Sequence, residues 1–145
     1  MSGHRLTKKI LPRRYHIDLT ATLQEKEFSG SVAIELDIHS TSKVIELHER
    51  DLHILKSELR VGRRIVRTKV TAHPRDQTIH VTPSEPLRRG PATLYLQYRG
   101  KIDERMHGLY LASNGSETAL ATQCEAADAR AIFPCWDEPE FNACF

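Results

Sequence analysis

Apolar side chains recur at every second position through much of this chain, and this period constrains the fold more than any other feature. The clearest runs are residues 15–19, 32–38, 79–81 and 94–98. Shorter or less regular runs lie at 44–47, 52–59 and 65–71. Alternation of this kind predicts antiparallel strands that are buried on one face and exposed on the other. These runs are also rich in the β-branched and aromatic residues that strands favour.

Turn-forming residues separate the runs, among them Ser29-Gly30, Gly62, Gly90-Pro91 and Asn114-Gly115. No long stretch shows the 3.6-residue period of a helix. The chain has 145 residues, which is the size of one domain with a real core. Many short strands with regularly spaced turns therefore predict an all-β, antiparallel β-sandwich or barrel.

Charge and composition exclude several classes of partner. Lys and Arg number 21 and Asp and Glu 19, so the net charge of +2 gives no reason to expect binding to nucleic acid or a membrane surface. No apolar run is long enough to span a membrane, and no apolar segment follows the basic N-terminus as in a secretory signal. With three cysteines, an odd number, we expect reduced thiols and a cytoplasmic protein. A Cys124–Cys135 or Cys135–Cys144 bridge stays open if the chain is exported by another route.

Two motifs suggest chemistry that their spacing does not support. His48-Glu49 followed by His53 resembles the zinc-protease motif HExxH, but the two histidines are five residues apart instead of four, so they share no helix face. We expect solvated strand ends and a turn there. A basic cluster includes Arg60, Arg63 and Arg64, but no stacking aromatic residue is interleaved with it. A charged hairpin tip explains this cluster better than a nucleic-acid site.

The alternation is lost after residue 119, where all three cysteines and the single Trp lie. Residues 126–132 are expected to form a short helical turn that Pro134 stops. If the preceding residues are extended, Gln123 and Glu125 point to the same side. Such a pair can hold an ammonium group and a neighbouring carbonyl. The alternative is a pair of edge-strand polar residues, with Asp128 and Arg130 forming an ordinary surface ion pair.

Residues 122–139 read Thr-Gln-Cys-Glu-Ala-Ala-Asp-Ala-Arg-Ala-Ile-Phe-Pro-Cys-Trp-Asp-Glu-Pro. This segment closely resembles a signature of the zinc aminopeptidase N family, which includes puromycin-sensitive aminopeptidase. Four shorter fragments resemble other family motifs in the same order, namely residues 11–15, 28–32, 47–52 and 107–110. The resemblance extends over residues 11–145.

The resemblance implies an architecture. In this family the N-terminal domain is a saddle-shaped antiparallel β-sandwich that packs against a thermolysin-like catalytic domain. We therefore expect residues 1–10 to be disordered or extended. Residues 11–145 are expected to form that sandwich, incomplete at its C-terminal end.

The resemblance also implies roles for particular residues. Gln123 corresponds to a residue that lies along the substrate near its first side chain, and Glu125 to one that binds the free α-ammonium. Cys124 stands where a larger apolar residue is frequent, which would alter the pocket for the first residue. The remaining motif residues are expected to be structural, fixing the loop and the domain contact: Asp128, Arg130, Pro134, Asp137, Glu138 and Pro139.

The chain has no HExxH motif, no following Glu ligand and no recognisable catalytic Tyr, so we assign it no catalytic and no metal-binding residue. Zinc is expected in the full-length enzyme and outside this chain. The implied partners are the N-terminus of a peptide substrate and the enzyme's own catalytic domain. The isolated chain should self-associate through surfaces that its catalytic domain would cover. The alternatives are a stand-alone, non-catalytic sandwich that binds protein or peptide, and a sandwich of unrelated function such as carbohydrate binding.

Overall fold

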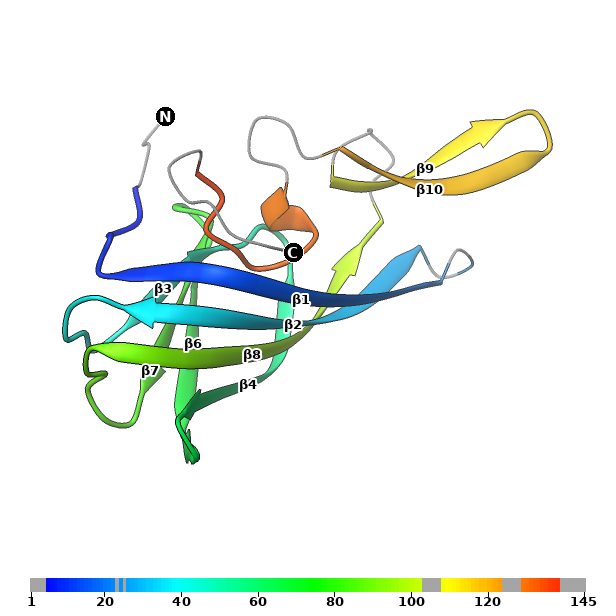
Figure 1. The fold of residues 1–145 in the computed structure, drawn as a ribbon. Helices are drawn as coiled ribbons and strands as arrows, with labels where there is room; N and C mark the ends of the chain where they lie inside the picture. The colour runs from blue at the N-terminus through cyan, green and yellow to red at the C-terminus, as the bar shows by residue number, and fades with distance from the viewer. Residues whose placement is uncertain (1–4, 23, 25, 103–107, 124–128, 139–145) are drawn as a thin grey trace.

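The computed structural model describes residues 5–138 except 23, 25, 103–107 and 124–128 (Figure 1). Strands dominate this part of the chain, and the one helical segment is a short 3₁₀ turn. The elements are β1 (Ile10–Thr22), β2 (Glu27–Ile38), β3 (Ile45–His48), β4 (His53–Val61), β5 (Arg64–Val66), β6 (Thr68–His73), β7 (Thr78–Pro83), β8 (Gly90–Lys101), β9 (Gly108–Asn114), β10 (Glu117–Gln123) and η1 (Ala129–Ala131). The all-β antiparallel prediction is confirmed.

A five-stranded antiparallel sheet, in the order β1-β2-β8-β4-β5, forms the larger layer (Figure 1). Alternation in β2 buries Val32, Ile34, Leu36 and Ile38. The β8 partners of the first three are buried as well, including Leu96, which pairs with Val32. The apolar face of the sheet is therefore built from the period-two residues that the sequence identified.

A three-stranded sheet, β3-β7-β6, supplies the second layer. Its buried residues Ile45, Leu47, Ile79 and Val81 belong to the same hydrophobic core as the inner face of the five-stranded sheet. The run at 65–71, expected as one strand, is divided between β5 in the larger sheet and β6 in the smaller one. The chain changes sheet at this point, and local alternation carries no signal for such a change.

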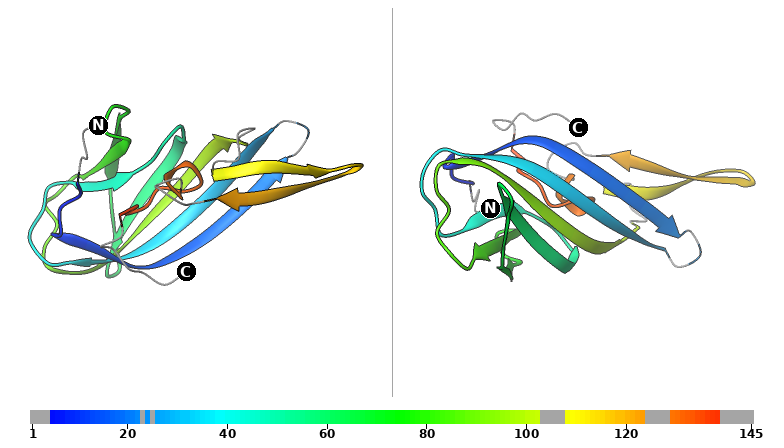
Figure 2. Two further views of the ribbon diagram at one scale, coloured as in Figure 1. Left: turned by 90° about the horizontal axis from the view of Figure 1, so that it is seen from above. Right: turned by 60° about the horizontal axis from the view of Figure 1, so that its bottom comes forward.

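The β9–β10 hairpin projects beyond the two sheets (Figures 1 and 2). Its turn falls at the predicted Asn114-Gly115, and Gly115 adopts the positive φ of 65° that favours glycine. The flanking strands were not predicted, because their alanine-rich sequences do not alternate clearly. No helix in the described part of the chain is long and apolar enough to cross a membrane.

Two reciprocal pairs of glycine and aromatic residues lie near one end of the β2–β8 register, at the start of β2. Gly30 lies opposite Tyr98, and Phe28 lies opposite Gly100. A Cβ placed on Gly30 would lie 2.6 Å from Cζ of Tyr98 and 2.9 Å from Cδ2 of Leu19. The Tyr98 side chain is fully buried, so it has little room to retreat. Gly30 is therefore required by the close approach of the ring across the sheet.

We predict that Gly30→Ala lowers the free energy of unfolding by about 1–3 kcal/mol, because the added methyl would lie too close to the buried Tyr98 ring. Urea denaturation of the purified chain measures this. The matched control introduces Gly30→Ala in a Tyr98→Leu background, where the smaller leucine side chain relieves the clash. If Gly30→Ala costs the same in both backgrounds, the aromatic ring is not the reason for the glycine.

Candidate functional site

Strand β10 ends at Gln123, which pairs with Gly108 at the start of β9. The backbone of Gln123 is thus fixed at the base of the hairpin. The side chain of Gln123 is outside what the structure describes, as are residues Glu125, Asp128 and Pro139. Their assigned roles stay predictions. The structure does describe the next segment, residues 129–138, in detail.

The segment 129–138 begins with the 3₁₀ turn η1, in which the N–H groups of Ile132 and Phe133 both donate to the carbonyl of Ala129. A helical turn before Pro134 was expected over residues 126–132, and the described part of that range contains η1. After the turn, five consecutive residues are buried, from Ile132 to Trp136. The segment therefore packs into the core of the sandwich.

Arg130 closes the segment into a loop. Its Nε donates to Oδ2 of Asp137 at 3.0 Å, and its NH2 group donates to the Asp137 carbonyl at 3.1 Å. Its NH1 group donates to Oε1 of Gln77 at 3.2 Å, which ties the loop to the turn before β7. The side chains of Arg130 and Asp137 are only 11% and 16% exposed. Because both side chains are partly buried, the attraction between them is stronger than in an ion pair on the open surface.

His48 anchors the other end of the segment. Its backbone exchanges hydrogen bonds with Cys135, and its ring Nδ1 accepts from the N–H of Asp137 at 3.1 Å. An Nδ1 that accepts places the proton of the neutral ring on Nε2. That nitrogen lies 3.7 Å from Oε1 of Glu138, an oxygen that also accepts from the N–H of Leu6 at 2.9 Å. His48 thus joins the segment to β3, and Glu138 joins it to the N-terminal residues.

The expectation of solvated strand ends at His48 and Glu49 is wrong. His48 is 2% exposed and Glu49 is 6% exposed. Burial raises the pKa of the Glu49 carboxyl, whose Oε2 accepts from the N–H of Leu52 at 2.9 Å. His53 is exposed at the start of β4. The sequence could not reveal the burial of His48, since Asp137, whose N–H its ring accepts, lies 89 residues further along.

Tyr15 contributes a further contact from β1. Its hydroxyl accepts from the N–H of Trp136 at 3.0 Å, and its ring packs edge-on against Phe133 with centroids 5.6 Å apart. Burial raises the pKa of the Tyr15 hydroxyl. Sequence reasoning placed Tyr15 on the apolar face of its strand but missed this role. Gln77 carried no sequence signal at all.

The structure describes only some of the residues that the cysteine and metal predictions concern. Cys135 is 3% exposed within the core, while Cys124 and Cys144 are outside the described residues. Within the ranges that the structure covers, no three His, Cys, Asp or Glu side chains converge in a way that would hold a metal ion. The residues at hand therefore do not fit a zinc centre.

We predict that His48→Asn keeps more stability than His48→Leu, although Leu matches the volume of His more closely. Asn places an acceptor near the position of Nδ1, whereas Leu leaves the buried Asp137 N–H unsatisfied at a cost of about 1–3 kcal/mol. Urea denaturation of the two variants measures the difference. Equal stability, or a more stable Leu variant, would show that the ring does not act as an acceptor here.

Comparison with known proteins agrees with this geometry. A family model described as the peptidase M1 N-terminal domain matches residues 11–145. Aminopeptidase M1 of Arabidopsis thaliana and endoplasmic reticulum aminopeptidase 1 of Homo sapiens are each 34% identical to this chain and cover 97% of it. Aminopeptidase N of Acetobacter pasteurianus is 29% identical, also over 97% of the chain.

The chain spans only part of these relatives, amounting to 17%, 16% and 40% of their respective lengths. The matched residues nevertheless include strands β2 to β10, all of β1 except Ile10, and the segment 129–138. On these grounds the chain belongs to the peptidase M1 N-terminal domain family.

Proposed function

We propose that this chain is the N-terminal domain of a zinc-dependent aminopeptidase that removes N-terminal residues from peptides. Its own contribution is to bind the substrate N-terminus through Gln123 and Glu125. The observation that carries the proposal is the anchoring of the segment 129–138, which begins four residues after Glu125. A family match over residues 11–145 supports it independently.

The described residues on both sides of positions 124–128 are anchored. On one side, Gln123 is the last paired residue of β10. On the other, the backbone carbonyl of Arg130 accepts from the N–H of Arg50 at 2.9 Å, and the Arg130 side chain is held by Asp137. A short connection between two fixed ends holds a binding carboxylate with less conformational freedom than an open loop would.

The chemistry explains selection for a chain end. A Glu125 carboxylate accepts hydrogen bonds from an α-ammonium, while the Gln123 amide donates to the neighbouring carbonyl. An internal peptide bond offers no cation at this position, so it would leave the carboxylate desolvated and unpaired. That penalty disfavours internal peptide bonds and favours substrates with a free amino group.

Zinc and the general base are proposed to lie outside this chain, in the catalytic domain of the same enzyme. When bound there, zinc polarises the scissile carbonyl and activates water. Arg130, Pro134, Asp137 and Glu138 are proposed to keep the binding loop in place and to support the contact with that domain, together with Asp128 and Pro139. We further propose a cytoplasmic enzyme that has no nucleic-acid or membrane partner.

We predict that Glu125→Ala lowers kcat/KM for aminoacyl reporter substrates by about a hundredfold or more in the full-length protein, because a charge-assisted contact to the ammonium is lost. Steady-state kinetics measures this. The matched control is Glu117→Ala, which removes an exposed carboxylate from the other end of β10. Unchanged kcat/KM in the Glu125 variant would refute the assigned role.

We also predict that the isolated chain self-associates. Strand β1 ends the order of the five-stranded sheet and is 13 residues long, and among the described strands only β2 pairs with it. A long, open sheet edge is a template for pairing with a second copy. Light scattering over a wide concentration range measures the association. A monomer at every concentration would contradict the prediction.

A further inference from the structure

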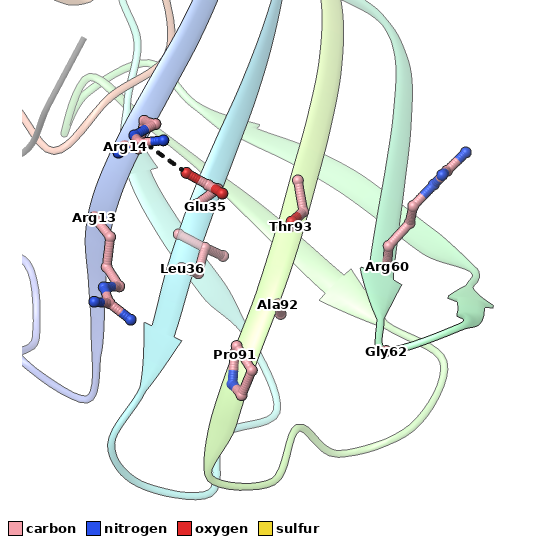
Figure 3. A pocket seen from close by; sticks show the side chains of 9 residues that line it. All are labelled: Arg13, Arg14, Glu35, Leu36, Arg60, Gly62, Pro91, Ala92 and Thr93. Carbon is pink, nitrogen blue, oxygen red and sulfur yellow. Dashed lines mark ion pairs between the residues drawn. The ribbon is translucent and has the colours of Figure 1, made fainter.

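A groove of about 620 Å³ lies on the outer face of the five-stranded sheet, and no residue of the segment 129–138 lines it. Strands β1, β2, β8 and β4 all contribute to it (Figure 3). Nine of the described residues line it, among them the charged residues Arg13, Arg14, Glu35 and Arg60, together with Thr93. The proposed function rests instead on Gln123, at the end of β10, and on Glu125.

One transverse row of side chains crosses the groove. In the strand register Arg14 lies opposite Glu35, Glu35 opposite Thr93, and Thr93 opposite Arg60. Three spacings between neighbouring strands separate the ends of this row, or roughly 14 Å. The row therefore sets guanidinium groups at opposite margins of one shallow surface.

A β-bulge brings a third guanidinium to the same surface. The pairing of β1 with β2 shifts between Pro12 and Arg14, which leaves Arg13 without a partner in the register. As a result, the consecutive residues Arg13 and Arg14 both line the groove (Figure 3). In regular strand geometry, neighbouring residues point to opposite faces. The bulge thus concentrates positive charge on one side of β1.

The balance of charge in the groove is positive. Three arginines line it but only one carboxylate, Glu35, and that carboxylate lies 3.6 Å from the Arg14 guanidinium. The Arg60 side chain is 62% exposed, so its guanidinium is accessible to a ligand even though Glu58 lies 3.6 Å away. The whole chain carries a net charge of only +2, so this concentration does not reflect a generally basic surface.

We propose that this groove binds an acidic peptide segment of a partner protein. Guanidinium forks match carboxylates in geometry and charge. An extended peptide rises about 3.3 Å per residue, so about four residues span the distance between the margins. None of the nine lining residues is aromatic, which removes the stacking surface that a single-stranded nucleic acid uses.

The test measures binding of fluorescein-labelled pentaglutamate to the 145-residue chain by fluorescence anisotropy at low and at high salt. Pentaglutamate should bind at low salt and weaken as salt screens the exposed charges. Arg13→Glu/Arg60→Glu should weaken binding by about tenfold or more. The matched control, Lys69→Glu/Arg75→Glu, makes the same change in charge at exposed positions in and beside β6, outside the groove, and should bind as the parent chain does.

Four outcomes would overturn the proposal. They are no binding up to millimolar peptide, equal binding of labelled pentaglutamine, equal weakening by the control variant, and displacement of the peptide by inorganic phosphate at equal molar concentration. The last outcome would assign the groove to free anions instead of a peptide. Thermal unfolding of both charge-reversal variants confirms that they are folded, as expected for substitutions of exposed side chains.

Discussion

The docking of the segment 129–138 into the core is the interaction on which the rest of the structure depends. An irregular segment is costly to bury, because its backbone groups lose their hydrogen bonds to water. Here the ring of His48, the hydroxyl of Tyr15 and the guanidinium of Arg130 replace those bonds. Each comes from a different part of the chain, so the segment links β1, β3 and the turn before β7 to the end of the described structure.

The sandwich supplies the rigid frame for this docking. Its inner faces are filled by alternating apolar residues, and its register between β2 and β8 includes glycine–aromatic pairs such as Gly30 with Tyr98. The frame positions Tyr15 within β1 and His48 at the end of β3. The hairpin that carries Gln123 then extends from this frame, and η1 packs beside β9 at its base. Gln123 is thus the last residue of one ordered element, and the next, η1, begins six residues later.

Sequence predicted the layers better than the contacts between them. Alternation predicted β2 and β8 because each strand has one buried face. The Asn114-Gly115 pair predicted a turn because few residues other than glycine tolerate a positive φ. The division of residues 65–71 between two sheets was not predicted, since alternation does not indicate which sheet a strand joins. The contacts of Arg130 with Asp137 and Gln77 were not predicted either, because the sequence suggested the nearby Asp128 as the ion-pair partner of Arg130. For Gln123 and Glu125 the local pattern left a binding pair and an edge-strand pair as alternatives, and only the family resemblance gave each residue a specific role.

The central claim is that this domain helps to select a free peptide N-terminus. The most direct measurement incubates the full-length protein with two peptides of identical sequence, one with a free amino group and one N-acetylated, and follows the products by mass spectrometry. The account predicts stepwise loss of N-terminal residues from the free peptide alone. Equal cleavage of the acetylated peptide, or cleavage of internal bonds, would contradict it.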